Sequence, residues 1–138
     1  MDVLSFITPK ARTFYIEEDA TVRQAVEKFD FHKFSVVPII GKNGEYVSTL
    51  SEGDILRYIK NEADFDISAA EHVRVTEIEK YRPYKALDLR AETEEIVRLS
   101  LEQNFIPIVD DRGAYMGIVK RKAIIDYLFS NSVLTEDR

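Results

Sequence analysis

Three consecutive cations, Lys120-Arg121-Lys122, are the residues of this chain best suited to binding an anion. They follow an apolar strand and stand where a helix is predicted to begin. A helix dipole disfavours positive charge at its N-terminus. A phosphate bound there would accept hydrogen bonds from the free backbone N–H groups and from the cationic side chains. The run therefore predicts a phosphate site, and the alternative is a basic helix face in contact with solvent.

The remaining polar residues give little support to catalysis. His32 and His72 are the only two histidines, and they lie in unrelated places without the spacing of metal ligands. The sequence has no glycine-rich phosphate loop and no nucleophile elbow. It also has no cysteine, which excludes disulfides and thiolate metal sites. We therefore expect a non-catalytic protein, with no catalytic residue, no metal and no required cofactor.

Composition limits the classes of partner. The chain has 138 residues, 45% of them hydrophobic, which is enough for one compact core. Its net charge of −6 argues against a nucleic-acid partner, because nucleic-acid-binding domains normally carry a basic surplus. No apolar run approaches the roughly 18–20 residues of a membrane span, and the first residues do not resemble a secretory leader. We expect a soluble cytoplasmic protein with no membrane partner.

The secondary-structure elements that must position these residues occur as two similar copies in the sequence. Residues 36–40 and 105–109 are apolar strands with a central proline, and each is followed by a glycine turn and a tyrosine. The two copies are 69 residues apart without a gap over more than twenty positions. An offset of half the chain predicts a duplicated unit. We divide the chain into repeat 1 (residues 1–62), a linker (63–72) and repeat 2 (73–138).

Each repeat is predicted to run β-α-β-β-α. In repeat 1 the elements are a strand at 13–16, a helix capped by Thr21, strands at 35–40 and 46–50, and a helix capped by Ser51. In repeat 2 they are a strand at 86–89, a helix at 92–101, strands at 104–109 and 115–119, and a helix at 120–130, with the tail from Asn131 expected to fray. Three short strands cannot cover their own apolar face. The fold class is therefore α/β (α+β), with two units packed sheet to sheet about a pseudo-twofold axis.

This pattern resembles a tandem pair of CBS (cystathionine-β-synthase-type) domains, the Bateman module, over essentially the whole chain. The motifs that carry the resemblance are the apolar-Pro-apolar strand, the glycine hairpin, and a strand that runs into Ser/Thr-x-x-Asp, here Ser51 to Asp54. The resemblance implies a regulatory module that binds AMP, ADP, ATP or cyclic di-AMP, forms a homodimer and modulates an unidentified effector protein. The basic pair Arg121-Lys122 is similar to that of small stand-alone bacterial CBS proteins that bind cyclic di-AMP.

The resemblance also implies roles for individual residues. Ser51 and Asp54 would bind ribose, because a carboxylate can accept hydrogen bonds from two hydroxyl groups; the alternative is that they only cap a helix. Phosphate would meet Lys120, Arg121 and Lys122, and a nucleotide with its ribose on Asp54 would reach them. The residues predicted to form the adenine pocket are Thr13, Phe14, Phe34, Ser35, Val37 and Pro38. For Val36 and Ile39 of the same strand the alternative is ordinary core packing. The secondary phosphate candidates are Lys10, Arg12 and Lys33.

The two repeats differ at the predicted ribose position. Lys120 and Ala123 stand in repeat 2 where repeat 1 has Ser51 and Asp54, so a second cleft would lack the ribose carboxylate. Two other functions stay open at this stage: a structural or dimerisation module with no nucleotide bound, and an enzyme acting on nucleotides. The sequence leaves open which nucleotide binds, whether one or both clefts are used, how a dimer is oriented, and which partner is regulated.

Overall fold

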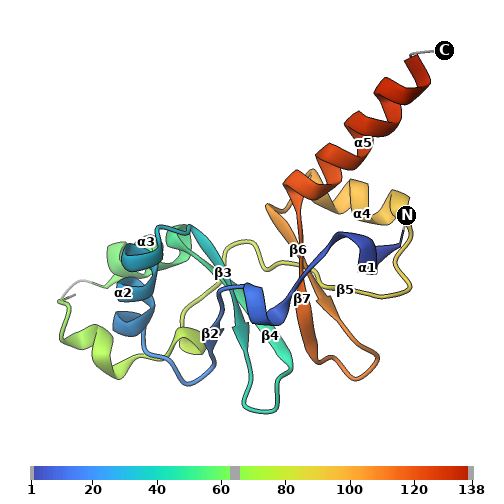
Figure 1. Cartoon of the computed structure of the whole chain (residues 1–138). Helices are drawn as coiled ribbons and strands as arrows, with labels where there is room; N and C mark the ends of the chain where they lie inside the picture. The colour runs from blue at the N-terminus through green and yellow to red at the C-terminus, as the bar shows by residue number, and fades with distance from the viewer. Residues whose placement is uncertain (1, 63–65, 137–138) are drawn as a thin grey trace. The chain divides into compact units, whose positions relative to one another are not determined.

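The computed structural model describes residues 2–62 and 66–136, with side chains to residue 131. The chain divides into two compact units, each with its own sheet (Figure 1). We call residues 14–83 the central unit, and residues 1–13 together with 84–138 the terminal unit.

The central unit holds a three-stranded sheet in the order β2-β3-β4, formed by β2 (Ile16–Glu17), β3 (Val36–Ile40) and β4 (Tyr46–Ser51). β2 pairs with β3 in parallel, and β3 pairs with β4 as a hairpin. The helices are α2 (Val22–His32) and α3 (Glu52–Asn61), with two 3₁₀ turns, η2 (Ala69–His72) and η3 (Val75–Glu77). The parallel pairing starts at Ile39, one residue beyond Pro38, so the missing proline N–H falls beside a gap in the ladder.

The terminal unit holds a four-stranded sheet in the order β1-β7-β6-β5. Its strands are β1 (Ile7–Pro9), β5 (Leu87–Asp88), β6 (Phe105–Val109) and β7 (Tyr115–Lys120). Its helices are α1 (Val3–Phe6), η1 (Lys10–Arg12), α4 (Thr93–Ser100) and α5 (Arg121–Glu136). The predicted order β-α-β-β-α is therefore confirmed twice, as β2-α2-β3-β4-α3 and as β5-α4-β6-β7-α5.

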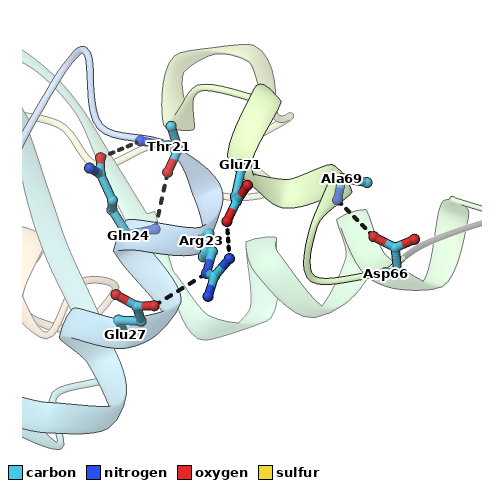
Figure 2. Close-up of polar contacts among 7 residues, drawn as sticks. All are labelled: Thr21, Arg23, Gln24, Glu27, Asp66, Ala69 and Glu71. Atoms are coloured by element: carbon cyan, nitrogen blue, oxygen red, sulfur yellow. Dashed lines mark hydrogen bonds and ion pairs between the residues drawn. The ribbon is translucent and has the colours of Figure 1, made fainter.

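The N-terminus of α2 shows why the sequence forms a helix there. Thr21 accepts a hydrogen bond from the backbone N–H of Gln24, and the Gln24 side chain accepts one from Thr21 N–H at 3.0 Å (Figure 2). This reciprocal capping box satisfies two backbone donors that a helix start leaves unpaired. Val22, Ala25 and Phe29 then form the buried stripe, at the spacing that predicted the helix.

Segments from one repeat complete the core of the other. β1 belongs to repeat 1 but pairs with β7 of repeat 2, with Ile7 opposite Val119 and Pro9 opposite Gly117. In the central unit, Val75 and Ile78 from repeat 2 are buried in the core formed by repeat 1. The compact units therefore do not coincide with the sequence repeats. The repeat boundaries themselves stay a prediction about the sequence.

Polar contacts fasten the segment from repeat 2 to α2. Val22 N–H donates to the Val73 carbonyl at 2.8 Å, and Val75 N–H donates to the Ala20 carbonyl at 2.9 Å. Arg23 on α2 forms ion pairs with Glu27 on the same helix and with Glu71 in η2 (Figure 2). Residues 66–72, which the sequence assigned to a linker, thus contain a 3₁₀ turn packed on α2, and residues 63–65 of that linker lie outside the described residues.

The prediction for the C-terminal tail was wrong over residues 131–136. α5 continues to Glu136, although we expected the helix to end near Ser130 and fray from Asn131. The segment 131–136 contains neither Gly nor Pro, so nothing in it stops a helix. The Asn131 side chain donates to the Tyr127 carbonyl one turn earlier, at 2.8 Å.

Candidate functional site

Ser51 and Asp54 meet at the junction of β4 and α3. The Ser51 hydroxyl accepts a hydrogen bond from Asp54 N–H at 3.1 Å, and the Asp54 carboxylate accepts one from Ser51 N–H at 3.0 Å. This is a second capping box, and it confirms the predicted N-cap at Ser51. Ser51 and Asp54 therefore do cap α3, as the alternative interpretation expected. Their role in binding ribose stays a prediction.

Asp54 has further partners that the sequence did not predict. Only 4% of its surface is exposed. Its Oδ1 atom accepts a hydrogen bond from Arg57 Nη2 at 2.9 Å and one from the backbone N–H of Tyr81 at 2.9 Å. A buried carboxylate needs such donors, because removing an unpaired charge from water is costly. Asp54 therefore binds the start of α3 to the segment that follows η3.

A cleft of about 310 Å³ opens beside Asp54, lined in part by Arg57, Tyr58, Glu77 and Tyr81. The Arg57 guanidinium carbon lies 4.3 Å from the centre of the Tyr81 ring, a cation–π contact. Burial raises the pKa of Tyr58 above its ordinary value, and the negative charges of Glu62 and Glu77 raise it further. The Asp54 side of the central unit is thus a partly enclosed and predominantly acidic cleft.

Lys80 lies close to the same carboxylate. Its ammonium group donates hydrogen bonds to the backbone carbonyls of Val75 and Ile78, the second at 2.8 Å. Burial lowers the pKa of Lys80, and the charge of Asp54 acts in the opposite direction. The Val75 carbonyl belongs to η3 and the Ile78 carbonyl to the segment that follows it, so Lys80 ties together the backbone that presents Tyr81 N–H to Asp54.

Five of the six predicted adenine residues lie in the central unit. The rings of Phe14 and Phe34 are 5.6 Å apart, and 57% of Phe14 is exposed. Val37 and Pro38 are buried in β3. Of the two residues for which core packing was the alternative, Ile39 is buried and Val36 is partly buried. Ser35 is exposed, and its carbonyl accepts a hydrogen bond from Glu52 N–H at 2.9 Å, which places it beside the start of α3.

The structure adds a third ring to this aromatic pair. His32, at the end of α2, lies 4.4 Å from Phe14 between ring centres and is nearly parallel to Phe34, at 5.6 Å and 10°. Nothing in the sequence pattern connects His32 with Phe14. It becomes a neighbour because Lys33 ends α2 in the left-handed conformation, with φ of 59°, and turns the chain towards β3.

The sixth adenine candidate, Thr13, belongs to the terminal unit. Its hydroxyl donates to the Lys10 carbonyl at 2.9 Å and accepts a hydrogen bond from the Tyr115 hydroxyl at 2.9 Å. Five of the six predicted phosphate residues, Lys10, Arg12, Lys120, Arg121 and Lys122, also belong to this unit. The expectation that one nucleotide contacts both Asp54 and these cations stays a prediction.

The cations form two groups at opposite ends of β7. β1 runs antiparallel to β7 with Pro9 opposite Gly117, so Lys10 and Arg12 in η1 lie towards the start of β7. Lys120 stands at the other end of the strand. With a rise of about 3.3 Å per residue, the five steps from Tyr115 to Lys120 span about 17 Å. We therefore treat the two groups as separate candidates.

Arg121 already has a structural partner. Its Nε donates to the Ser100 carbonyl at 2.8 Å, at the C-terminus of α4, where a helix dipole favours a cation. Lys120 and Lys122 are exposed, and neither has an ion pair within the part of the chain whose side chains are described. Lys33, a secondary phosphate candidate, pairs with Asp30 at 3.1 Å.

Among the described residues, no group of three or more histidine or acidic side chains is arranged to hold a metal ion. In the same part of the chain, no helix has the length and apolar character needed to cross a membrane.

Comparisons with known proteins bear on the fold. Residues 6–61 match the model of the CBS domain family. The sequence matches none of the curated proteins. The fold is similar to CbpB in complex with c-di-AMP, with a TM-score of 0.86 and 19% identity over 100% of this chain and 91% of that chain.

Two further structures show the same fold. The Listeria monocytogenes CbpB protein, in complex with c-di-AMP, has a TM-score of 0.83 and 16% identity over 95% of this chain and 97% of that one. CBSX2 in complex with AMP has a TM-score of 0.70 and 24% identity over 99% of this chain and 98% of that one. Residues 6–61 therefore match the CBS domain family, and the fold of the whole chain is similar to that of these solved structures.

Proposed function

We propose that this protein is a non-catalytic regulatory module that binds an adenine nucleotide, either AMP, ADP, ATP or cyclic di-AMP. The observation that carries the proposal is the group of residues that β3, β4 and α3 assemble in the central unit. The Phe14 and Phe34 rings, the exposed Ser35 and the Asp54 carboxylate belong to connected elements of one unit. Support comes from relatives of the same fold that were solved with c-di-AMP or AMP.

The proposed division of labour follows the chemistry of each group. Phe14 and Phe34 offer apolar faces on which a purine can stack. Asp54, with Ser51, accepts hydrogen bonds from the two ribose hydroxyls. Lys120 and Lys122 are exposed cations at the start of α5, where free backbone N–H groups also favour a phosphate.

The regulatory output is proposed to be a change in the activity of a cytoplasmic partner protein. A ligand can shift a protein between two states only by binding one of them more tightly. Exposed apolar side chains on α3 and α5, such as Leu56 and Phe129, also support the proposal of a homodimer. Sedimentation equilibrium with and without nucleotide tests the homodimer, and a monomer at all concentrations would contradict it.

The ribose assignment is tested with Asp54→Ala and Asp54→Asn. We expect calorimetry with AMP, ATP and cyclic di-AMP to show affinity reduced about tenfold or more in both variants, because a hydrogen bond to a charged group is worth about 1.5–3 kcal/mol. The matched control is Glu52→Ala, which removes an exposed carboxylate from the first turn of the same helix. Equal affinities for wild type and both Asp54 variants would remove the assignment.

A structural or dimerisation module without nucleotide is the second candidate function. The observation that favours it is the full set of partners that Asp54 already has within the protein. Thermal denaturation distinguishes the two candidates, because a ligand at 100 times its Kd adds about 2.7 kcal/mol to the free energy of unfolding. If no adenine compound shifts the melting temperature, the structural function is the better one.

A further inference from the structure

Asp54 cannot accept two ribose hydroxyls while it keeps all of its present partners. A carboxylate offers about four lone-pair positions. Three are occupied, by Ser51 N–H at 3.0 Å on Oδ2 and by Arg57 Nη2 and Tyr81 N–H, both at 2.9 Å, on Oδ1. A vicinal diol needs two acceptor positions. One of the three donors must therefore leave when a ribose binds.

Arg57 is the donor that can leave. Ser51 N–H and Tyr81 N–H are backbone groups, and each would be left without an acceptor unless the main chain moved. Arg57 contributes a flexible side chain that is 44% exposed. Its guanidinium borders the cleft beside Asp54, so it can turn away without any change in the fold.

The released guanidinium then needs a new partner. The Tyr81 ring, 4.3 Å from the guanidinium carbon, stabilises Arg57 in its present position, so release has a cost. A nucleoside offers nothing in return, because it has no anionic group. A nucleotide brings a phosphate, and a guanidinium binds phosphate oxygens through two parallel N–H···O bonds.

We propose that Arg57 sets the selectivity of the Asp54 site for phosphorylated ligands. Its ion pair with Asp54 keeps nucleosides from the carboxylate, and when a nucleotide binds, Arg57 leaves Asp54 and pairs with the phosphate. This inference rests on the proposed ribose role of Asp54. Arg57 adds a cation of the central unit to the phosphate candidates, which otherwise lie in the terminal unit, apart from Lys33.

The test compares the affinities of adenosine and AMP for the intact protein by calorimetry. In wild type, AMP binds more tightly than adenosine. In Arg57→Ala, and in Arg57→Gln as a variant that keeps more of the side-chain stem, adenosine binds several-fold more tightly and AMP more weakly. The ratio of the two affinities falls about tenfold or more, the size expected for one charge-assisted hydrogen bond.

Two further variants separate this role from a structural one. Tyr81→Ala loosens Arg57 without removing it, so adenosine binds more tightly while AMP keeps its affinity. Arg98→Ala is the matched control, since it removes an exposed arginine that pairs with Glu94 at 2.7 Å in α4, and it leaves both affinities unchanged. A purely structural arginine predicts instead that Arg57→Ala weakens both ligands equally.

The outcomes distinguish this inference from the proposed function. If Asp54→Ala loses AMP affinity but Arg57→Ala keeps the wild-type ratio of adenosine to AMP affinity, the role of Arg57 is overturned and the nucleotide site stands. If neither adenosine nor any of AMP, ADP, ATP and cyclic di-AMP binds wild type, or if Asp54→Ala binds them as wild type does, the ribose role fails and the selectivity role fails with it.

Discussion

Two titratable side chains near the Asp54 cleft respond to burial in opposite ways. The pKa of Lys80 is lowered from its ordinary value of 10.5, because burial disfavours the charged ammonium group. The pKa of Tyr58 is raised from 10.0, because burial and the charges of Glu62 and Glu77 disfavour the phenolate. The two groups therefore make the stability of the protein depend on alkaline pH with opposite signs.

For Lys80, the unfolded chain binds the proton more tightly than the folded protein does. The free energy of unfolding should therefore rise with pH from the folded pKa of Lys80 up to 10.5. We expect Lys80→Met to flatten this rise. The measurement is urea unfolding at a series of pH values between about 8 and 11. Because Lys80→Met also loses two hydrogen bonds at every pH, the slope with pH is the diagnostic quantity.

For Tyr58, the folded protein keeps its proton longer than the unfolded chain does. Its contribution to the free energy of unfolding should fall as pH rises above 10.0. Tyr58→Phe removes this fall and leaves the effect of Lys80 in place, so the two variants act as controls for each other. Identical alkaline slopes in wild type, Lys80→Met and Tyr58→Phe would contradict both assignments.

Local sequence rules accounted for part of the residue-scale geometry. The Ser51–Asp54 capping box could be predicted from a Ser-x-x-Asp spacing before an apolar helix. Arg57 lies three residues after Asp54 on α3, where side chains are neighbours, so its ion pair was also within reach of the sequence. Tyr81 was not, because it is 27 residues from Asp54 and meets it only through the tertiary fold.

At the scale of elements, the pairing of β1 with β7 depends on Gly117. Its φ of +149° is a conformation that other residues rarely adopt, and a Cβ at this position would collide with the Thr8 carbonyl oxygen of β1. Repeat 1 has Ser48 at the equivalent position, in β4, which carries no such additional strand. The glycine therefore marks the place where one sheet accepts a fourth strand.

We expect Gly117→Ala to lower the free energy of unfolding by about 1–3 kcal/mol, the usual cost of overpacking a close contact. Ser48→Ala is the matched control at the equivalent position of repeat 1, and it should change stability by no more than about 0.5 kcal/mol, as is typical of substitutions that create no clash. Denaturant unfolding of the two variants measures the difference. A neutral Gly117→Ala would show that β1 does not approach β7 this closely.

The order of elements followed from periodicity, whereas some boundaries did not. Strand and helix types were confirmed in both repeats because apolar residues recur with the spacing of each structure and glycine turns separate them. The end of α5 was missed because polarity was taken as a stop signal, although residues 131–136 have no helix breaker. A helix ends where its backbone is forced to leave the helical conformation, and polar side chains alone do not force it.

At the scale of the whole molecule, the exchange of segments between repeats could not be predicted from the sequence. The sequence shows that β1 and the segment around Val75 are apolar. It does not show which of the two hydrophobic cores each segment joins. Local sequence rules describe neighbours along the chain. β1 instead pairs with a strand more than a hundred residues away.

Because segments are exchanged between the repeats, the central unit has a complete hydrophobic core and repeat 1 alone does not. The central unit includes Ala70, Val75 and Ile78, all of them buried in its core. A fragment of residues 1–62 lacks these three side chains, and burying one Val or Ile side chain is worth about 1.5–3 kcal/mol. That loss is large for a unit of about 70 residues, whose stability is marginal. We therefore expect residues 14–83 to unfold cooperatively in urea and residues 1–62 to show no cooperative transition.

The two fragments have similar lengths and share residues 14–62. A difference in the cooperativity of their unfolding therefore results from the completeness of the core and not from chain length. Val75→Asp within residues 14–83 serves as the internal control, because it places a charge in the core without shortening the chain, and it should abolish the transition. If residues 1–62 instead fold cooperatively while residues 14–83 do not, each repeat completes its own core, and the pairing of β1 with β7 is not what holds the N-terminal segment.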